Sequence, residues 1–414
     1  MSTQQSRIAQ LASVVASSTQ RIDEYLAQNA LPYPSFDSKG PTDLGLPPAL
    51  DELRLAALEA TQELNDLLQG PRNLIYNHRH NQLVHLSLIY RFGIAKLVPI
   101  DGELSFGDLA SKIGVDEGAV IRILRMGIAH RVFQEQRPGY ISHSAASRML
   151  VDDTSMTDWI GYEVEEMWPA AEKMVDALIK WPLAEELNQT GYSLAQNTND
   201  SLYAHMAKDA ERSRRFASAM TSLTRGEGYS MRHIAEGYDW DAIKAETIVD
   251  MGGSDGNAGF AIARRHPNLK VIVQDLAVNI PRNEDGLNVT FMAHDFFDEQ
   301  PVKDADVYLF RWVLHNWPDK YCIEILRKLA PALKDGARVL IMDFVMPTPL
   351  GIPNILDREL RWMDLIMMQF LNAKERELEE WKRLFAQADD RFQFQGVIKP
   401  QGSKLAILEI KWRT

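Results

Sequence analysis

One histidine stands where the general base of an α/β enzyme is expected. His315 lies just after the apolar run DVYLF, residues 306–310, which has the length and composition of a buried strand. Ligands of open α/β sheets bind at the carboxyl ends of the strands. Histidine is the usual general base near neutral pH, because its ordinary pKa is about 6.5. A lone histidine more often has a structural role, so the surrounding motifs decide its interpretation.

A glycine-rich turn lies upstream of this histidine. The run TIVD, residues 247–250, leads into MGGSDG, residues 251–256. Glycines between a strand and a helix allow a tight turn and a close approach of the backbone to a ligand. Such a turn alone is compatible with NAD, FAD or S-adenosylmethionine. The spacing D-x-G-G-x-x-G differs from the G-x-G-x-x-G of dinucleotide-binding proteins, which argues against the first two.

Carboxylates follow the next two predicted strands. Asp275 ends VIVQD, where its side chain can accept hydrogen bonds from ribose hydroxyls. Asp295 and Phe296 follow the third strand, where an acid can reach an adenine amine and a phenyl ring can stack on the base. Each aspartate alone could be a helix cap or a turn residue. Three such features at successive strand ends indicate a nucleoside site.

The elements that position these residues alternate between short β-branched runs and helices from about residue 245. This pattern predicts a Rossmann-like, doubly wound α/β sheet, closed by a terminal hairpin formed by FQFQGVIKP and KLAILEIKW. Upstream, the periodicity predicts an amphipathic helix over 6–30, a Pro-rich linker over 31–50, and a helix over 51–68 with Asp51 as its N-cap. A buried helix is expected to end at Pro99.

Residues 101–150 have the order of a winged helix, which is helix, turn, helix and a hairpin around Arg137. Ser105 and Asp116 are good N-caps for the two helices. One interpretation is DNA binding through a recognition helix near 117–131. The other is a structural or dimerisation module, which we favour because this segment carries equal numbers of acidic and basic side chains. Four segments are therefore expected: an arm and linker over 1–70, a winged-helix dimerisation domain over 71–150, a helical connector lining the acceptor pocket over 151–235, and the catalytic domain over 236–414.

The composition narrows the class of protein. The chain has 414 residues and a net charge of −12, which argues against general affinity for nucleic acid or anionic membranes. A single cysteine, Cys322, excludes an intrachain disulfide and fits a reducing compartment. The N-terminus lacks the apolar stretch of a signal peptide, and no apolar run is long enough to span a membrane. A cytoplasmic protein is expected.

The motifs VDMGGSDG, VQDLA, HDFF, FRWVLHNWPDKYC, VLIMDFVMP and NAKERELEEW occur in this order. Together they resemble the plant caffeic-acid and flavonoid O-methyltransferases, and even more their fungal secondary-metabolism relatives. The resemblance covers residues 60–414, and its HNW and KER blocks are the most specific. It implies S-adenosylmethionine as methyl donor, a small aromatic acceptor with a phenolic hydroxyl, a homodimer, and no metal.

The resemblance also implies individual roles. His315 would deprotonate the acceptor hydroxyl, with Asp343 and Glu375 flanking and orienting its imidazole. Other positions match those that contact the methyl donor: Gly252, Gly253, Asp275, Leu276, Asp295, Phe296 and Arg311. A third set matches positions that line the acceptor pocket: Phe216, Met220, Ile366 and Met367.

Three positions depart from the family pattern. Ser254 replaces a glycine, which is tolerable if that residue does not need a positive φ. Asn316 follows His315 where plant members have Asp, and Asp343 is one methylene shorter than the plant Glu. A non-methylating pericyclase on the same scaffold is the main alternative function, and a winged-helix regulator is the third.

A homodimer built through the N-terminal half is expected on physical grounds as well. Residues 6–30 precede an extended linker, so their apolar stripe should not be buried locally. The segment QLVHLSLIYRFGIAKLV, residues 82–98, is expected to expose an apolar surface. A patch of this kind usually marks an interface, and a second copy of the chain is the simplest partner.

Overall fold

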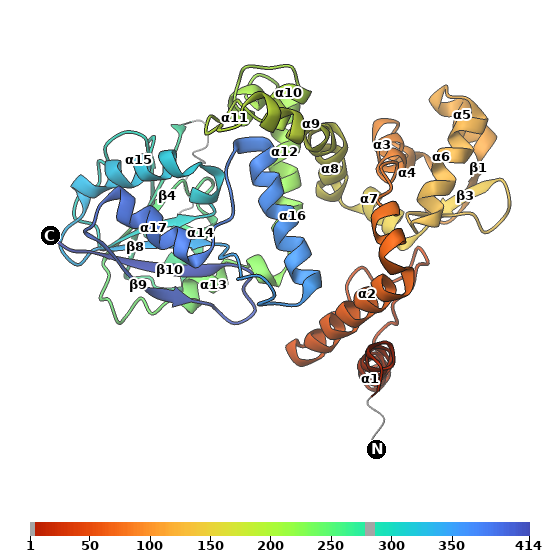
Figure 1. Ribbon diagram of the computed structural model, residues 1–414, viewed down its shortest axis with the longest axis horizontal. Coiled ribbons are helices and arrows are strands. Elements are labelled where there is room, and N and C mark those ends of the chain that lie inside the picture. Colours follow the sequence, from red (N-terminus) through yellow and green to blue (C-terminus); the bar gives the residue numbers. More distant parts are fainter. Residues whose placement is uncertain (1–4, 278–285) are drawn as a thin grey trace. The chain divides into compact units, whose positions relative to one another are not determined.

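The computed structural model describes residues 5–277 and 286–414, which form two compact units (Figure 1). The first unit is mainly helical and comprises Met1–Pro169, Asp209–Leu223 and Pro353–Leu356. The second is an α/β unit that comprises Ala170–Lys208, Thr224–Ile352 and Asp357–Thr414. The finer division into four segments stays a prediction.

The first unit begins with two long helices, α1 (Arg7–Gln28) and α2 (Pro48–Tyr76), which pack along each other. The expectation that the first helix cannot bury its apolar stripe locally is wrong. Leu11, Ile22 and Leu26 are buried within one chain, because the linker lets α2 fold back beside α1. Asp51 lies in the first turn of α2 and is not its N-cap, since Pro48 already begins the helix with a preset φ.

The predicted single helix before Pro99 is interrupted. Gly93 has a φ of 59°, which ends α3 (Val84–Arg91) and starts α4 (Ile94–Leu97). Most apolar side chains of this segment face the core of the unit, and Phe92 is its exposed large hydrophobic residue. The apolar surface expected along this segment is therefore in part internal.

The helices and hairpin expected within residues 101–150 are present. Ser105 caps α5 (Phe106–Ile113) and Asp116 caps α6 (Glu117–Ala129), as predicted. The strands β1 (Glu103–Ser105), β2 (Phe133–Gln134) and β3 (Tyr140–His143) form a small antiparallel sheet in the order β1-β3-β2. The unit is completed by α7 (Ala145–Asp152), α8 (Thr154–Tyr162), the π-helix η1 (Glu163–Met167) and α12 (Ala210–Leu223).

The second unit is built on a seven-stranded sheet in the order β6-β5-β4-β7-β8-β10-β9. The pairs from β6 to β8 are parallel, and β10 runs antiparallel to β8 and β9. This confirms the predicted doubly wound sheet. Its strands are β4 (Thr247–Met251), β5 (Lys270–Asp275), β6 (Val289–Ala293), β7 (Val307–Arg311), β8 (Arg338–Asp343), β9 (Phe392–Ile398) and β10 (Ala406–Trp412).

Helices cover this sheet (Figure 1), with α14 packed against β5 and α17 against β9. The central strands are buried on both faces, which is why they read as continuous apolar runs in the sequence. The helices of the unit are α9 (Trp168–Lys180), α10 (Gly191–Ala195), α11 (Leu202–Met206), η2 (Glu227–Tyr229), α13 (Arg232–Gly237), α14 (Asn257–Arg265), η4 (Leu314–Asn316), α15 (Asp319–Leu329), η5 (Ala330–Ala332), α16 (Asn354–Leu371) and α17 (Leu378–Ala388).

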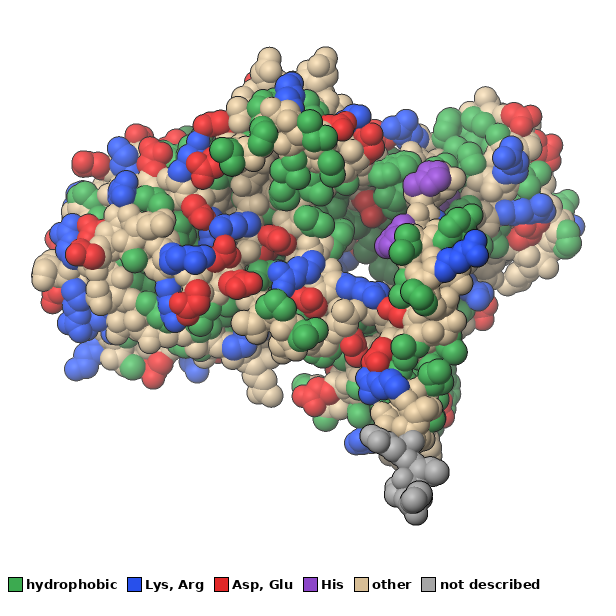
Figure 2. Space-filling view, in the orientation of Figure 1, with side chains coloured by type: hydrophobic (Ala, Val, Ile, Leu, Met, Phe, Trp, Pro, Cys, Tyr) green, Lys and Arg blue, Asp and Glu red, His purple; other side chains and the backbone are tan. Residues whose placement is uncertain are grey.

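The surface of the α/β unit is mixed in charge. On the face shown in Figure 2, acidic and basic side chains are interspersed over this unit, and they form no basic stripe there. Among the described residues, every helix is too short or too polar to cross a lipid bilayer.

Candidate active site

The sheet order reverses between β4 and β7, and a crevice at the carboxyl ends of these two strands is where open α/β sheets bind ligands. The turn after β4 carries Gly252 and Gly253. Arg311 ends β7, and the turn after it carries Trp312 and His315. The topology therefore brings the glycine-rich turn and the predicted base to the same edge of the sheet.

The glycine-rich turn is tight at Gly252 and Gly253. Gly252 has a φ of 69°, and its N–H and that of Gly253 donate to Gln274 O at 2.8 and 3.0 Å. A Cβ on Gly253 would lie 2.6 Å from Asp250 Oδ2, and one on Gly252 would lie 3.1 Å from a methyl group of Val313. This close approach of bare backbone at the strand end fits a cradle for a nucleoside-bearing donor.

Ser254 does adopt a positive φ, of 50°. The replacement of the family's glycine by serine therefore has a conformational cost. A left-handed conformation costs a non-glycine residue about 1–2 kcal/mol. The conformation points the Ser254 N–H at Asp275 Oδ2, which accepts it at 2.8 Å. The serine thus helps to orient the carboxylate predicted to bind ribose.

The other predicted donor contacts lie at the same strand ends. Asp275 Oδ1 also accepts the N–H of Leu276, whose side chain is exposed. Asp295 is exposed beyond β6, with Oδ1 accepting the Phe297 N–H at 3.0 Å. The Phe296 ring packs edge-on to Trp317 and reaches within 3.5 Å of the position that a Cβ on Gly252 would take.

Arg311 ends β7 as a largely buried cation. Its Nη2 donates to Tyr229 O at 2.9 Å. Burial lowers the pKa of Arg311, and the nearby carboxylates of Asp250 and Asp343 oppose that shift. Burial also raises the pKa of Asp250 to about 7, with Arg311 acting against it. The charges of these two buried groups therefore partly compensate each other.

His315, Asp343 and Glu375 meet in a buried cluster. His315 Nδ1 lies 2.8 Å from Glu375 Oε1 and 4.0 Å from Asp343 Oδ1. Burial lowers the pKa of His315, but the two carboxylates outweigh it, so the net shift is upward. Burial raises the pKa of Asp343 to about 7. Both oxygens of Asp343 and the second oxygen of Glu375 are buried without a hydrogen-bond partner.

One aromatic side chain packs on His315, and two more pack behind it. Trp312 stacks on its imidazole, with ring centroids 5.8 Å apart and an interplanar angle of 9°. Tyr229 and Phe344 pack against Trp312 in turn. Sequence reasoning missed all three. Trp312 could have been noticed from its place between Arg311 and His315, whereas Tyr229 offers no local signal because it lies more than 80 residues away.

Asn316 has a structural contact. Its Nδ2 donates to Trp312 O at 3.2 Å, across the short helix that carries His315. The amide therefore holds the turn, which fits the loss of any acid–base role at this position.

The four predicted acceptor contacts belong to two helices. Phe216 and Met220 lie on α12 of the first unit, where the Phe216 ring contacts Tyr162 at 5.4 Å between centroids. Ile366 and Met367 lie on α16 of the second unit and are buried. Their shared role in one pocket stays a prediction.

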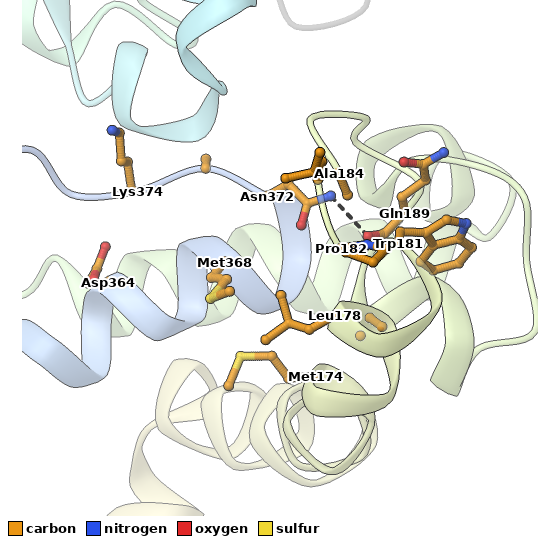
Figure 3. Close-up of a pocket in the computed structure, with 14 residues that line it drawn as sticks. Met174, Leu178, Trp181, Pro182, Ala184, Gln189, Asp364, Met368, Asn372 and Lys374 are labelled. Atoms are coloured by element: carbon orange, nitrogen blue, oxygen red, sulfur yellow. Dashed lines mark hydrogen bonds between the residues drawn. The ribbon is translucent and has the colours of Figure 1, made fainter.

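A cavity of about 370 Å³ lies between α9 and α16 in the second unit (Figure 3). Met174 and Leu178 of α9 face Met368 of α16, and Asp364 and Lys374 lie at its other end. His315 does not line it. The cavity borders the segment that carries Glu375, because Asp364 Oδ1 accepts the Glu375 N–H at 2.9 Å.

The sequence is similar to known O-methyltransferases. Residues 178–390 match a family described as an O-methyltransferase domain. The grayanic acid biosynthesis cluster O-methyltransferase of Cladonia grayi is 41% identical over 99% of this chain and 88% of its own length. Chlorophenol O-methyltransferase of Trichoderma longibrachiatum is 38% identical over 99% of this chain and 91% of its own length.

Solved structures share the fold. OxaC in complex with SAH and oxaline matches with a TM-score of 0.76 and 20% identity, over 98% of this chain and 99% of OxaC. A structure titled "A Pericyclic Reaction enzyme" matches with a TM-score of 0.70 and 22% identity, over 97% of this chain and all of that chain. These likenesses establish the fold of the chain.

The chain belongs to the O-methyltransferase family, and its activity is S-adenosylmethionine-dependent O-methylation.

Replacing Asp275 by alanine is expected to weaken binding of the methyl donor by a few kcal/mol. The carboxylate is held by the N–H groups of Ser254 and Leu276 in the place where it can accept ribose hydroxyls, and charged hydrogen bonds contribute about 1.5–3 kcal/mol each. Titration calorimetry with S-adenosylmethionine measures the change. Asp241→Ala, an exposed carboxylate of the same unit, is the matched control. Equal donor affinity in wild type and Asp275→Ala would show that the strand end has been misassigned.

Proposed function

We propose that His315 is the general base of the reaction and takes the proton from a phenolic hydroxyl of a small aromatic secondary metabolite. The observation that carries the proposal is the 2.8 Å contact between His315 Nδ1 and Glu375 Oε1. Because a carboxylate accepts a hydrogen bond, Nδ1 carries the proton, and Nε2 keeps the lone pair that a base needs.

The neighbouring groups suit this role. Nε2 of His315 makes no hydrogen bond among the described residues, so it is free to receive the proton of the acceptor hydroxyl. Glu375 fixes the tautomer and, with Asp343 at 4.0 Å, stabilises the imidazolium that forms. The stacked Trp312 holds the plane of the ring. Proton removal then occurs at a fixed atom in a site with little access to water.

The methyl donor binds at the strand ends described above. S-adenosylmethionine supplies a methyl group on a positively charged sulfur, which is already activated for displacement. Gly252 and Gly253 provide the backbone cradle, and Asp275 the ribose contact. The protein must then align the acceptor oxygen and deprotonate it, which are the contributions of positioning and of a general base.

The phenolic class of acceptor is supported by the named relatives, among which is a chlorophenol O-methyltransferase. The buried apolar side chains Ile366 and Met367 on α16 suit an aromatic ring. Incubation with methyl-labelled S-adenosylmethionine and a panel of phenols should transfer label to at least one of them. A protein that binds the donor but labels no phenol would contradict the proposal.

A pericyclase is the second candidate, favoured by the likeness to a solved pericyclic-reaction enzyme. The complete His315, Asp343 and Glu375 cluster favours methyl transfer, because a pericyclic step moves no proton to a base. The labelling experiment separates the two functions, since a pericyclase converts its substrate without transferring label.

Metal chelation is expected to leave turnover unchanged. The donor atoms of His315, Asp343 and Glu375 all lie within 4.8 Å of one another, so an ion could be held there. The proposed role needs Nδ1 to be protonated and hydrogen-bonded to Glu375, which metal binding at that atom would prevent. Turnover after EDTA treatment and gel filtration measures this. A loss of activity that zinc, manganese or magnesium restores would replace the general-base mechanism by a metal-assisted one.

The proposed enzyme is a cytoplasmic homodimer. We place the candidate interface on the second half of α2, in addition to the N-terminal segments named above, because it exposes large apolar side chains: Leu67, Leu68, Leu74, Ile75 and Tyr76. Exposed apolar groups of this density usually mark an interface. Light scattering at micromolar concentration should give twice the chain mass. The double variant Ile75→Lys, Tyr76→Lys should shift the mass towards that of one chain. A wild-type protein that is monomeric at this concentration would contradict the proposed dimer.

A further inference from the structure

Arg376 is buried beside the proposed base, although the reaction gives it no direct role. Its side chain has no exposed surface, which is rare for an arginine. It also follows Glu375 directly in the chain. Burying a guanidinium is costly unless hydrogen-bond acceptors satisfy its N–H groups. The acceptors that Arg376 contacts therefore indicate its role.

The donors of Arg376 hold the turn that carries His315. Nη1 donates to Leu314 O at 3.1 Å, and Nη2 donates to Trp317 O at 2.8 Å. These two carbonyls flank His315 in the chain. Nε and Nη2 also reach Asp319 Oδ1 at 2.9 and 2.8 Å, where α15 begins.

The backbone of Arg376 reaches the third member of the cluster. Its carbonyl accepts the N–H of Met346 at 2.9 Å, three residues beyond Asp343 at the end of β8. His315, Asp343 and Glu375 come from three segments of the chain. Arg376 lies in the segment of Glu375 and is hydrogen-bonded to the segments that carry the other two.

We infer that Arg376 is a positioning residue, which sets the distance between the His315 imidazole and the Glu375 carboxylate. This inference rests on the proposed function of His315. The planar fork of arginine can serve the Leu314 and Trp317 carbonyls and Asp319 together, whereas the compact ammonium of lysine cannot. Lys374 offers the contrast, because it also pairs with Asp319, at 3.1 Å, but lines the cavity and is partly exposed.

Two substitutions test the inference. Arg376→Lys keeps the charge but not the fork, and should lower kcat by about 10–10²-fold, as misplacement by about 1 Å does. The Kd for S-adenosylmethionine should stay within about twofold, since Arg376 does not reach the donor residues. Lys374→Met is the matched control, with a kcat within about threefold of wild type.

The pH dependence separates positioning from general destabilisation. Glu375 and Asp343 raise the pKa of His315, and the Arg376 cation lowers it. Arg376→Lys keeps a cation at this place but loosens the contact between His315 and Glu375, so the acid limb of the pH–rate profile should move to lower pH. Arg376→Met, which removes both the fork and the charge, is the second variant and should lower kcat at least as much. A merely structural arginine would lower the melting temperature and kcat without moving that limb.

His315→Gln, measured in the same series, keeps the two claims apart. Wild-type kcat in both Arg376 variants, with an inactive His315→Gln, would overturn the positioning role and leave the base in place. Wild-type kcat in His315→Gln as well would overturn the proposed function. If both Arg376 variants fail to fold, the arginine serves the stability of the whole chain, and the inference is wrong.

Discussion

Replacing His315 by glutamine is expected to lower turnover by about 10²–10⁴-fold, the usual contribution of a positioned general base. Glutamine occupies a similar volume but offers no lone pair that can hold a proton at neutral pH. His315 lies after β7, whereas the proposed donor contacts are Gly252, Gly253 and Asp275, so donor affinity should hardly change. Single-turnover methyl transfer measures the rate, and calorimetry with S-adenosylmethionine is the control. Near wild-type turnover in this variant would exclude His315 as the base.

The second large effect is expected at Glu375. Glu375→Gln should lower turnover by about 10²–10³-fold, because an amide holds the imidazole tautomer less firmly than a carboxylate, and Asp343 at 4.0 Å compensates only in part. The matched control is Glu379→Gln, which removes the same charge from an exposed residue of α17. Turnover of the control should equal that of the wild type.

The pH–rate profile of Glu375→Gln should change in a defined direction. His315 must be neutral to accept a proton, so activity is lost as the pH falls through its pKa. The Glu375 carboxylate raises that pKa, and its removal should move the acid limb to lower pH. The shift has the same direction as that expected for Arg376→Lys, which loosens the same contact. An acid limb that stays in place would mean that Glu375 does not act on the titrating group.

The sheet and its strand-end residues could be predicted because each depends on a short stretch of neighbouring residues. The apolar run before Gly252 and the one before His315 each predict a strand, and the predicted strand end then places the residue that follows it. Helix caps such as Ser105 and Asp116 are equally local, and both were predicted correctly. Asp51 was not, since a proline three residues earlier already starts the helix.

Contacts between distant segments could not be predicted in the same way. The stacking of Trp312 on His315 depends on the left-handed conformation of Trp312, with a φ of 57°, which no local pattern signals. The positive φ of Ser254 is explained only once Asp275, some 20 residues later, is seen to accept its N–H. Likewise, the burial of α1 against α2 depends on how the linker turns.

The central claim, that His315 removes the acceptor proton, is tested most directly with phenols of graded acidity built on one scaffold that the wild-type enzyme methylates. His315→Gln should be slowed most on weakly acidic phenols. Its defect should shrink steadily, towards the wild-type rate, as the phenol becomes acidic enough to be ionised before it binds. A defect of equal size on every phenol would show that His315 positions the acceptor or holds the fold, and is not the base.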